Sequence, residues 1–190
     1  MTNGDSASAA HVARIVRQCL EEGKTVIIDG LGAFRPNGKR GCRFVAQSAP
    51  KVFVAYVLED AAAVGRLCDQ LQENGFDAWV DRRKLMPGQN WPRAIESAIE
   101  TTDFFLACFS HNSVTKKGEF HAEIRYALDC ARQLPIDEVF LIPLRLDDCA
   151  VPARICREIQ YIDLFPDWRS GFHRIVTIIQ RELRKRSCAA

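Results

Sequence analysis

Hydrophobic and polar positions alternate along most of the chain in two different rhythms. From Lys51 onward, short apolar runs typical of strands take turns with stretches whose apolar residues recur every three or four positions, as on one face of a helix. The predicted strands are 51–57, 76–80, 103–110, 138–146 and 159–164. The predicted helices are 62–75, 91–102, 119–133, a short segment at 153–157, and 168–186. Five strand–helix units of this kind indicate an α/β fold with a doubly wound, five-stranded parallel sheet.

The third predicted strand, "DFFLACFS" at 103–110, carries the clearest signal in this pattern. It is a nearly continuous apolar run, whereas a strand with one solvated face would alternate. Such a run is typical of a central parallel strand that helices cover on both faces. We therefore expect this strand in the interior of the sheet.

The first 50 residues follow a different pattern. Ser, Asn and Ala dominate residues 1–10, which we expect to be disordered. An amphipathic helix is predicted for 11–23, a strand for 25–30, and a hairpin for 31–47 with "PNGKRG" as its turn. The predicted organisation is a disordered start at 1–10, a helix–hairpin extension at 11–50, an α/β domain at 51–183 and a basic tail at 184–190.

Composition narrows the function classes. The 47% of hydrophobic residues can fill a core, and a net charge of +2 gives no argument for nucleic acid or a membrane. The opening residues lack the pattern of a secretory signal, and the longest apolar run is too short to cross a bilayer, so we expect a cytoplasmic protein. The eight cysteines form no CxxC pair and lie at no metal-ligand spacing from a histidine. We therefore expect free thiols and no metal site.

The predicted topology itself indicates where a site would lie. In a sheet of order 2-1-3-4-5, the crevice lies at the carboxyl ends of strands 1 and 3, where the strand order reverses. This places residues 56–60 and 110–117 at the crevice, and the helix that carries Glu119 and Glu123 begins beside them. The sequence lacks both the phosphate loop of a flavin-binding protein and the strand-3 carboxylate of a response regulator. It also contains no glycine-rich phosphate motif.

Six motifs in order then resemble a known family. They are "KVFVAY" followed by "ED", "GFDAWVD" with "LMPGQNW", "FSHNSV", the helix "AEIRYAL", "FLIPLRLDDCAVP" and "IQYIDLF". Together they resemble Toll/interleukin-receptor (TIR) domains of bacterial type over roughly residues 51–183. The resemblance implies the flavodoxin-like TIR fold.

The TIR resemblance also implies a chemistry. Many TIR domains cleave the bond between nicotinamide and ribose in NAD+, giving nicotinamide and linear or cyclic ADP-ribose, while others are self-associating adaptors. The family's catalytic glutamate lies on the helix after strand 3, and Glu123 matches it. Nicotinamide leaves as a neutral ring, so one carboxylate can suffice to stabilise the oxocarbenium-like transition state. The implied substrate is NAD+, with no bound cofactor.

The helix around Glu123 can be placed by its apolar spacing. Its core-facing stripe consists of Phe120, Ile124, Ala127, Leu128 and Ala131. Glu123 is expected on the flank of this stripe, beside Glu119. The apolar surroundings and the neighbouring carboxylate should each raise the pKa of Glu123. Glu119 stands where active relatives often carry an aromatic residue, so it is either part of the substrate pocket or a solvated glutamate. Tyr56 or Trp91 could supply the missing aromatic ring.

Two roles are open for the loop 81–90, which matches the family's BB loop. Lys84 and Gly88 match positions that line the nucleotide pocket in active members, and the cations of the loop could meet a pyrophosphate or remain solvated. The loop also packs against a neighbouring TIR domain in the family. The candidate partner-binding residues are Arg82, Arg83, Leu85, Met86, Pro87, Gln89 and Trp91. At the end of strand 3, Ser110 and Ser113 could bond the ribose or cap the following helix.

A weaker resemblance concerns the amino-terminal piece. "IVRQCLEEGKTVIIDGLGAFRP" is similar to the helix and hairpin of histone-like HU proteins, over about thirty residues. The first helix and the DNA-contacting arms of that family are missing, so we expect a dimerisation hairpin or a strand laid against the TIR body. A DNA-anchored sensor is the weaker alternative.

Two functions from different classes therefore remain. The first is an NAD+ hydrolase that self-association activates, in bacterial immunity or virulence. The second is a non-catalytic module that binds itself or other TIR-containing proteins through the BB loop.

Overall fold

The chain divides into two compact units, residues 1–49 and residues 50–190. The computed structural model describes residues 3–28, 32–37, 41–46, 48–80, 90–115, 118–135 and 137–189. Within the described residues, no helix combines the length and the apolar character that crossing a membrane requires.

The first unit is a helix followed by a small antiparallel sheet. Helix α1 spans Asn3–Glu21 and the strands are β1 (Val26–Ile28), β2 (Gly32–Asn37) and β3 (Gly41–Ala46), in the order β1-β2-β3. The rings of Phe34 and Phe44 pair across β2 and β3 with centroids 4.8 Å apart. The helical start at Asn3 corrects the expectation of disorder over residues 1–10. The segment "SASAA" contains three alanines, the residue with the highest helix propensity, and it continues the helix toward the amino terminus.

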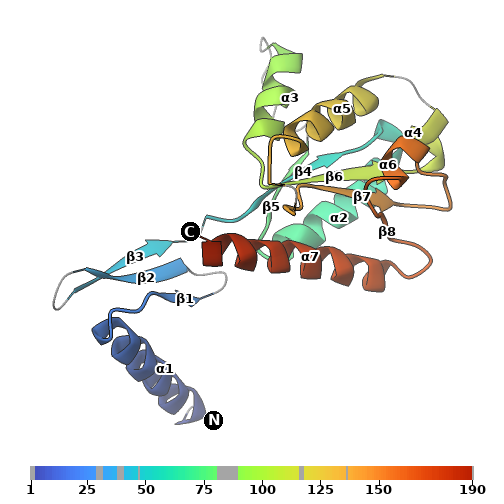
Figure 1. Cartoon of the computed structure of the whole chain (residues 1–190). Helices are drawn as coiled ribbons and strands as arrows, with labels where there is room; N and C mark the ends of the chain where they lie inside the picture. Colours follow the sequence, from blue (N-terminus) through green and yellow to red (C-terminus); the bar gives the residue numbers. More distant parts are fainter. Residues whose placement is uncertain are drawn as a thin grey trace. The chain divides into compact units, whose positions relative to one another are not determined.

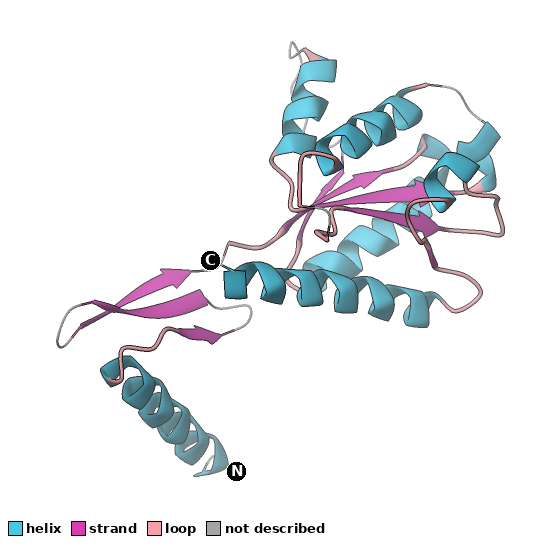
Figure 2. Ribbon diagram, viewed as in Figure 1, coloured by secondary structure: helices cyan, strands magenta, loops and turns pink. Residues whose placement is uncertain are grey.

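The second unit contains the predicted five-stranded parallel sheet (Figures 1 and 2). Its strands are β4 (Lys51–Ala55), β5 (Asp77–Val80), β6 (Phe104–Phe109), β7 (Leu141–Arg145) and β8 (Ile162–Asp163). They follow the order β5-β4-β6-β7-β8, which is the predicted 2-1-3-4-5. Every residue of β6 is buried, as the apolar run of this strand predicts. The fold class derived from the sequence is confirmed.

Helices cover both faces of this sheet. They are the 3-10 turn η1 (Leu58–Asp60) and α2 (Ala61–Glu73), α3 (Trp91–Glu100), α4 (His111–Thr115), α5 (Glu119–Ala131), α6 (Ala153–Cys156) and α7 (Trp168–Ala189). Helices α2 and α7 lie on one face and α3 and α5 on the other (Figure 1).

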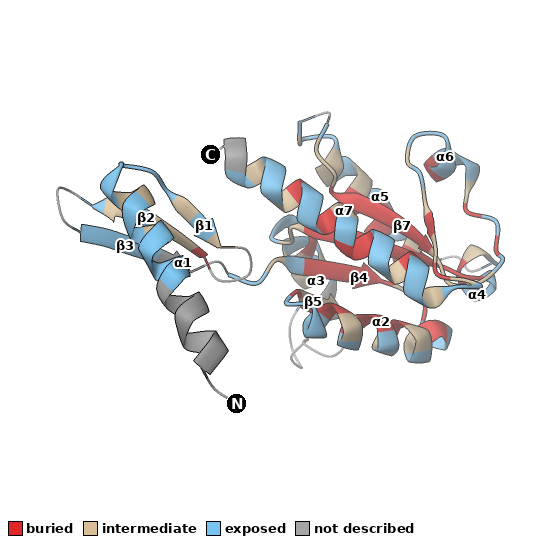
Figure 3. Cartoon of the chain, turned by 90° about the horizontal axis from the view of Figure 1, so that it is seen from below, coloured by how far each residue is buried: buried red, intermediate tan, exposed pale blue. Residues whose placement is uncertain are grey.

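The sheet separates two hydrophobic clusters, and β4 shows how. Val52 and Val54 point into the cluster under α2 and α7, while Phe53 and Ala55 point into the cluster under α3 and α5. Side chains on a strand alternate between the faces, so one fully apolar strand feeds both clusters. Figure 3 shows the buried strands between helices that are exposed on their outer sides.

The carboxyl end of the chain differs from the prediction. Residues 184–190 were expected to form a basic tail, but α7 continues to Ala189. Arg186 lies against the sheet, where its Nη2 is 2.8 Å from an Oε1 of Glu138. Cations in the last turn of a helix are favoured by the helix dipole, and Arg186 also has a partner elsewhere in the same unit.

Candidate functional site

The site begins at the point where the strand order reverses, between β4 and β6. Tyr56 and η1 follow β4, and Ser110 follows β6. Both segments lie at the carboxyl edge of the sheet because the two strands are parallel neighbours. This is the position at which open α/β sheets bind ligands.

Asp60 connects the segment after β4 to the segment after β6. Its side chain is 9% exposed, and its Oδ2 accepts a hydrogen bond of 2.5 Å from the hydroxyl of Ser110. Its Oδ1 accepts a second hydrogen bond, of 2.9 Å, from Nδ2 of Asn112. Hydrogen bonds to an ionised acceptor are about twice as strong as neutral ones, so Asp60 holds the end of β4 to the segment after β6. Asp60 lies inside the predicted range 56–60 but was not predicted as a site residue.

Ser110 and Ser113 form a reciprocal pair at the start of α4. The backbone N–H of Ser110 donates to Oγ of Ser113 at 2.8 Å, and the N–H of Ser113 donates to Oγ of Ser110 at 3.1 Å. The Ser113 hydroxyl also donates to the Ser110 carbonyl oxygen at 3.0 Å. Both side chains are buried, at 1% and 0% exposed. This is the geometry of a helix cap, the second of the two roles considered for these serines.

Glu123 lies in the second turn of α5 and is only 6% exposed. Glu123 was expected on the flank of the apolar stripe, and in the structure this flank is covered, so that Glu123 is buried together with Phe120, Ile124 and Ala127. Helix α5 packs against α3 as well as against β4 and β7, which widens the arc that its neighbours cover. The helix begins at the carboxyl edge after β6, so its first turns lie nearest this edge of the sheet (Figure 1).

The remaining candidates around Glu123 are distributed over different surfaces. Glu119, the first residue of α5, is exposed. Tyr56 packs against the cluster under α2 and α7, on the face of the sheet opposite α5. Trp79 packs against the cluster on the α5 face, with its ring 4.8 Å from that of Phe53. Trp79 is thus an aromatic residue on the same face of the sheet as α5.

Comparison with known proteins decides the family. The TIR domain family model matches residues 52–176, about two thirds of the chain. The chain belongs to the TIR family. An uncharacterised protein, y4cD, of Sinorhizobium fredii is 25% identical over 121 residues, which make up 64% of this chain and 19% of that protein. The matched part of the chain thus spans about a fifth of the length of this relative.

Solved structures agree on the fold of this TIR domain. The TIR domain of the Toll-related receptor TRR-2 from Hydra magnipapillata is 22% identical, with a TM-score of 0.56, and the match covers 68% of this chain and 97% of that one. The TIR domains of the activated Roq1 resistosome, which directly recognises the pathogen effector XopQ, are 16% identical. Their TM-score is 0.53, over 71% of this chain and 99% of that one. At these identities the likeness shows the fold alone.

The BB-loop candidates of the TIR domain lie outside the described residues. These are Arg82, Arg83, Lys84, Leu85, Met86, Pro87, Gly88 and Gln89. Trp91 is the first residue of α3, which Asn90 caps by accepting a hydrogen bond from the N–H of Arg93 at 3.4 Å. The roles of these residues toward NAD+ or a partner stay predictions.

A second polar contact lies further along the same edge of the TIR domain. The backbone N–H of His111 donates to both carboxylate oxygens of Asp147 at 3.1 Å, and its Nδ1 lies 3.0 Å from Oδ1. Burial raises the pKa of Asp147, but the hydrogen bonds from His111 outweigh this and the pKa is lowered. Burial, and then the charge of Asp147, raise the pKa of the Cys149 thiol to about 11. The start of α4 is thus tied to the segment after β7 as well as to Asp60.

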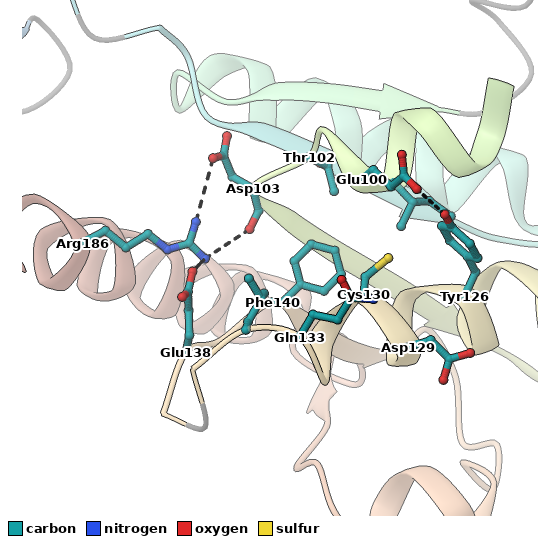
Figure 4. A pocket seen from close by; sticks show the side chains of 12 residues that line it. Glu100, Thr102, Asp103, Tyr126, Asp129, Cys130, Gln133, Glu138, Phe140 and Arg186 are labelled. Carbon is teal, nitrogen blue, oxygen red and sulfur yellow. Dashed lines mark hydrogen bonds and ion pairs between the residues drawn. The ribbon is translucent and has the colours of Figure 1, made fainter. Parts of the chain in front are cut away.

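The opposite, amino-terminal edge of the sheet carries a pocket of about 360 Å³. Its wall includes Glu100, Tyr126, Asp103 and Arg186 (Figure 4). The Tyr126 hydroxyl donates to Glu100, and this hydrogen bond raises the pKa of Tyr126 to about 12. Tyr126 thus lines a pocket at the opposite edge of the sheet from the first turn of α5.

Proposed function

We propose that this TIR domain cleaves the nicotinamide–ribose bond of NAD+, with Glu123 as the catalytic carboxylate. The observation that carries the proposal is the burial of Glu123, which is 6% exposed near the start of α5. Burying a carboxylate costs free energy, and such groups concentrate at functional sites. The segments that follow β4 and β6, held together by the hydrogen bond between Ser110 and Asp60, lie at the same edge of the sheet.

The chemistry needs few protein groups. When the bond between C1′ of the ribose and the pyridinium nitrogen breaks, its electron pair goes to the nitrogen, and nicotinamide leaves as a neutral ring without a general acid. Positive charge develops on the ribose, where a carboxylate in a site of low dielectric stabilises it most strongly. The oxygen of a water molecule then bonds to C1′ and loses a proton, which gives ADP-ribose. Attack by a group of the substrate itself would give the cyclic product instead.

Self-association belongs to the same proposal. TIR domains are present in the activated Roq1 resistosome. By analogy, copies of this TIR domain would associate and complete the substrate pocket at their contacts, with the BB loop taking part. Activity would then rise more steeply than in proportion to protein concentration.

A non-catalytic interaction module is the second candidate. The observation that favours it is Glu119, an exposed residue at the position where an aromatic ring was expected to stack on the substrate. In this case the domain would bind itself or other TIR-containing proteins, and Glu123 would be a buried structural carboxylate.

Nicotinamide release from NAD+ separates the two candidates. The assay uses the full chain over a range of concentrations, with and without a crowding agent, beside Glu123→Gln and Glu123→Ala. Glu119→Ala is the matched control, because it removes an exposed carboxylate one turn away on the same helix. We expect release by the wild type and by Glu119→Ala, and a loss of at least 100-fold in both Glu123 variants. Equal rates in all four proteins, or no release from a folded wild type at any concentration, would reject the proposal.

A further inference from the structure

The side chain of Asn112 has a fixed orientation at the carboxyl edge of the sheet, after β6. Its Nδ2 lies 2.9 Å from Oδ1 of Asp60, a carboxylate that is 9% exposed. An ionised carboxylate only accepts hydrogen bonds, so the amide must turn its NH₂ group toward Asp60 and its oxygen away from it. The orientation of the amide is therefore decided by the chemistry of its partner.

The outward oxygen of Asn112 is open to a ligand. Asn112 is exposed, and its Oδ1 accepts no hydrogen bond from the part of the chain that the structure describes. The residue lies in α4, directly after β6, at the strand-order reversal where a ligand of this fold would bind. Through its hydrogen bond to Asn112, Asp60 thus turns the neutral amide oxygen of Asn112 outward at this edge of the sheet.

Ser110, which was expected to bond the ribose, is less suited to this task. Its hydroxyl donates to Asp60 at 2.5 Å and accepts from the N–H of Ser113 at 3.1 Å. The side chain is only 1% exposed. Its proton is committed to a buried carboxylate, whereas Oδ1 of exposed Asn112 accepts no hydrogen bond from any described residue.

We propose that Asn112 binds a ribose hydroxyl of the nucleotide substrate through Oδ1, and that Asp60 is the positioning residue that fixes this orientation. The proposal rests on the proposed function and names a further substrate-binding residue for it. An amide oxygen matches an uncharged hydrogen-bond donor and would repel a phosphate. The hydroxyl groups of a ribose are donors of this kind, and the reacting C1′ atom belongs to a ribose.

Steady-state kinetics of nicotinamide release test the proposal. Asn112→Ala removes the acceptor and should raise KM about 3- to 10-fold with kcat within about 2-fold, the effect of losing one neutral hydrogen bond to the substrate. Asn112→Asp places a second carboxylate beside Asp60 and should raise KM at least as much. Thr115→Ala is the matched control on the same short helix, because its hydroxyl donates only to backbone carbonyl oxygens at 3.2 Å. It should leave both constants unchanged.

The outcomes separate this inference from the proposed function. If the wild type cleaves NAD+ and Asn112→Ala leaves KM unchanged, the role of Asn112 is rejected and the proposed function stands. A fall in kcat and in melting temperature at constant KM would also reject it, because that result indicates a structural role. If the wild type cleaves nothing, calorimetric binding of NAD+ decides. Weaker binding by Asn112→Ala than by Thr115→Ala supports the inference, and equal or absent binding overturns it.

Discussion

Replacing Arg186 by alanine should lower the free energy of unfolding of the TIR domain by about 2–4 kcal/mol. Nη2 of Arg186 lies 2.8 Å from the carboxylate of Glu138 and donates to the carbonyl oxygens of Val139 at 3.3 Å and Asp103 at 3.4 Å. The guanidinium carbon is 4.9 Å from the centre of the Phe104 ring. Each partly buried hydrogen bond contributes about 0.5–1.5 kcal/mol and the ring contact about 0.5–1 kcal/mol.

One group of the Arg186 side chain reduces its contribution to the free energy of unfolding. Its Nε is buried and has no hydrogen-bond partner among the described residues. The side chain as a whole is 28% exposed, so solvent screens the ion pair with Glu138. We therefore place the expected loss below the sum of the separate contributions.

Urea unfolding followed by tryptophan fluorescence measures the effect. All three tryptophans lie in the second unit, so the signal reports the TIR domain alone. With a slope of about 2 kcal/mol per molar urea, the midpoint should fall by about 1–2 M. Arg186→Lys keeps the charge but loses the planar fork and should recover less than half of the loss. Arg181→Ala, an exposed cation on the same helix, is the control and should shift the midpoint by less than about 0.3 M. Equal midpoints for Arg186→Ala and Arg181→Ala would refute the reasoning.

Three further predictions test the packing and the titrating groups. Gly171→Ala should lower the free energy of unfolding by about 1–3 kcal/mol in a thermal melt, because the added Cβ would lie 2.2 Å from a backbone oxygen. Gly65→Ala should raise it by about 0.5–1 kcal/mol, because the added Cβ would have nothing within 4 Å. Asp147→Asn should lower the urea midpoint at pH 7, and by progressively less as the pH falls below about 4. The pKa of Asp147 is lowered, so its contribution is present above the unfolded value of about 4 and is lost as pH falls through the folded value. Iodoacetamide at pH 8, followed by mass spectrometry, should modify exposed Cys156 well before buried Cys149, whose pKa is about 11; faster modification of Cys149 would contradict this.

The sheet could be predicted from the sequence because its central strand is apolar at every position. The apolar run Phe104–Phe109 can be recognised as a buried strand from its own residues. The other strands follow from the alternation of strand and helix patterns along the chain. The ends of the chain were less predictable. The basic composition of residues 184–190 resembles a tail, and only the fold places Arg186 beside Glu138, which lies far from it in sequence.

The site was predictable in location but not in detail. Topology placed the crevice after β4 and β6, yet Asp60 and Asn112 are 52 residues apart, and no local pattern links them. The available signal was that both directly follow strands whose carboxyl ends meet. The sequence places Glu123 at the edge of an apolar stripe. Its nearly complete burial could not be predicted, because it depends on neighbours of α5 in both the sheet and α3.

The division of the core by the sheet affects how this protein can change over evolution. The cluster under α2 and α7 contains neither α5 nor the side chains that pack against it. Effects of substitutions at well-separated sites that share no partner usually add. Lineages could therefore gain or lose stability on the α2 and α7 face while the surroundings of Glu123 stay constant. Substitutions under α3 and α5 would change stability and chemistry together, so the two faces of one sheet should accept mutations at different rates.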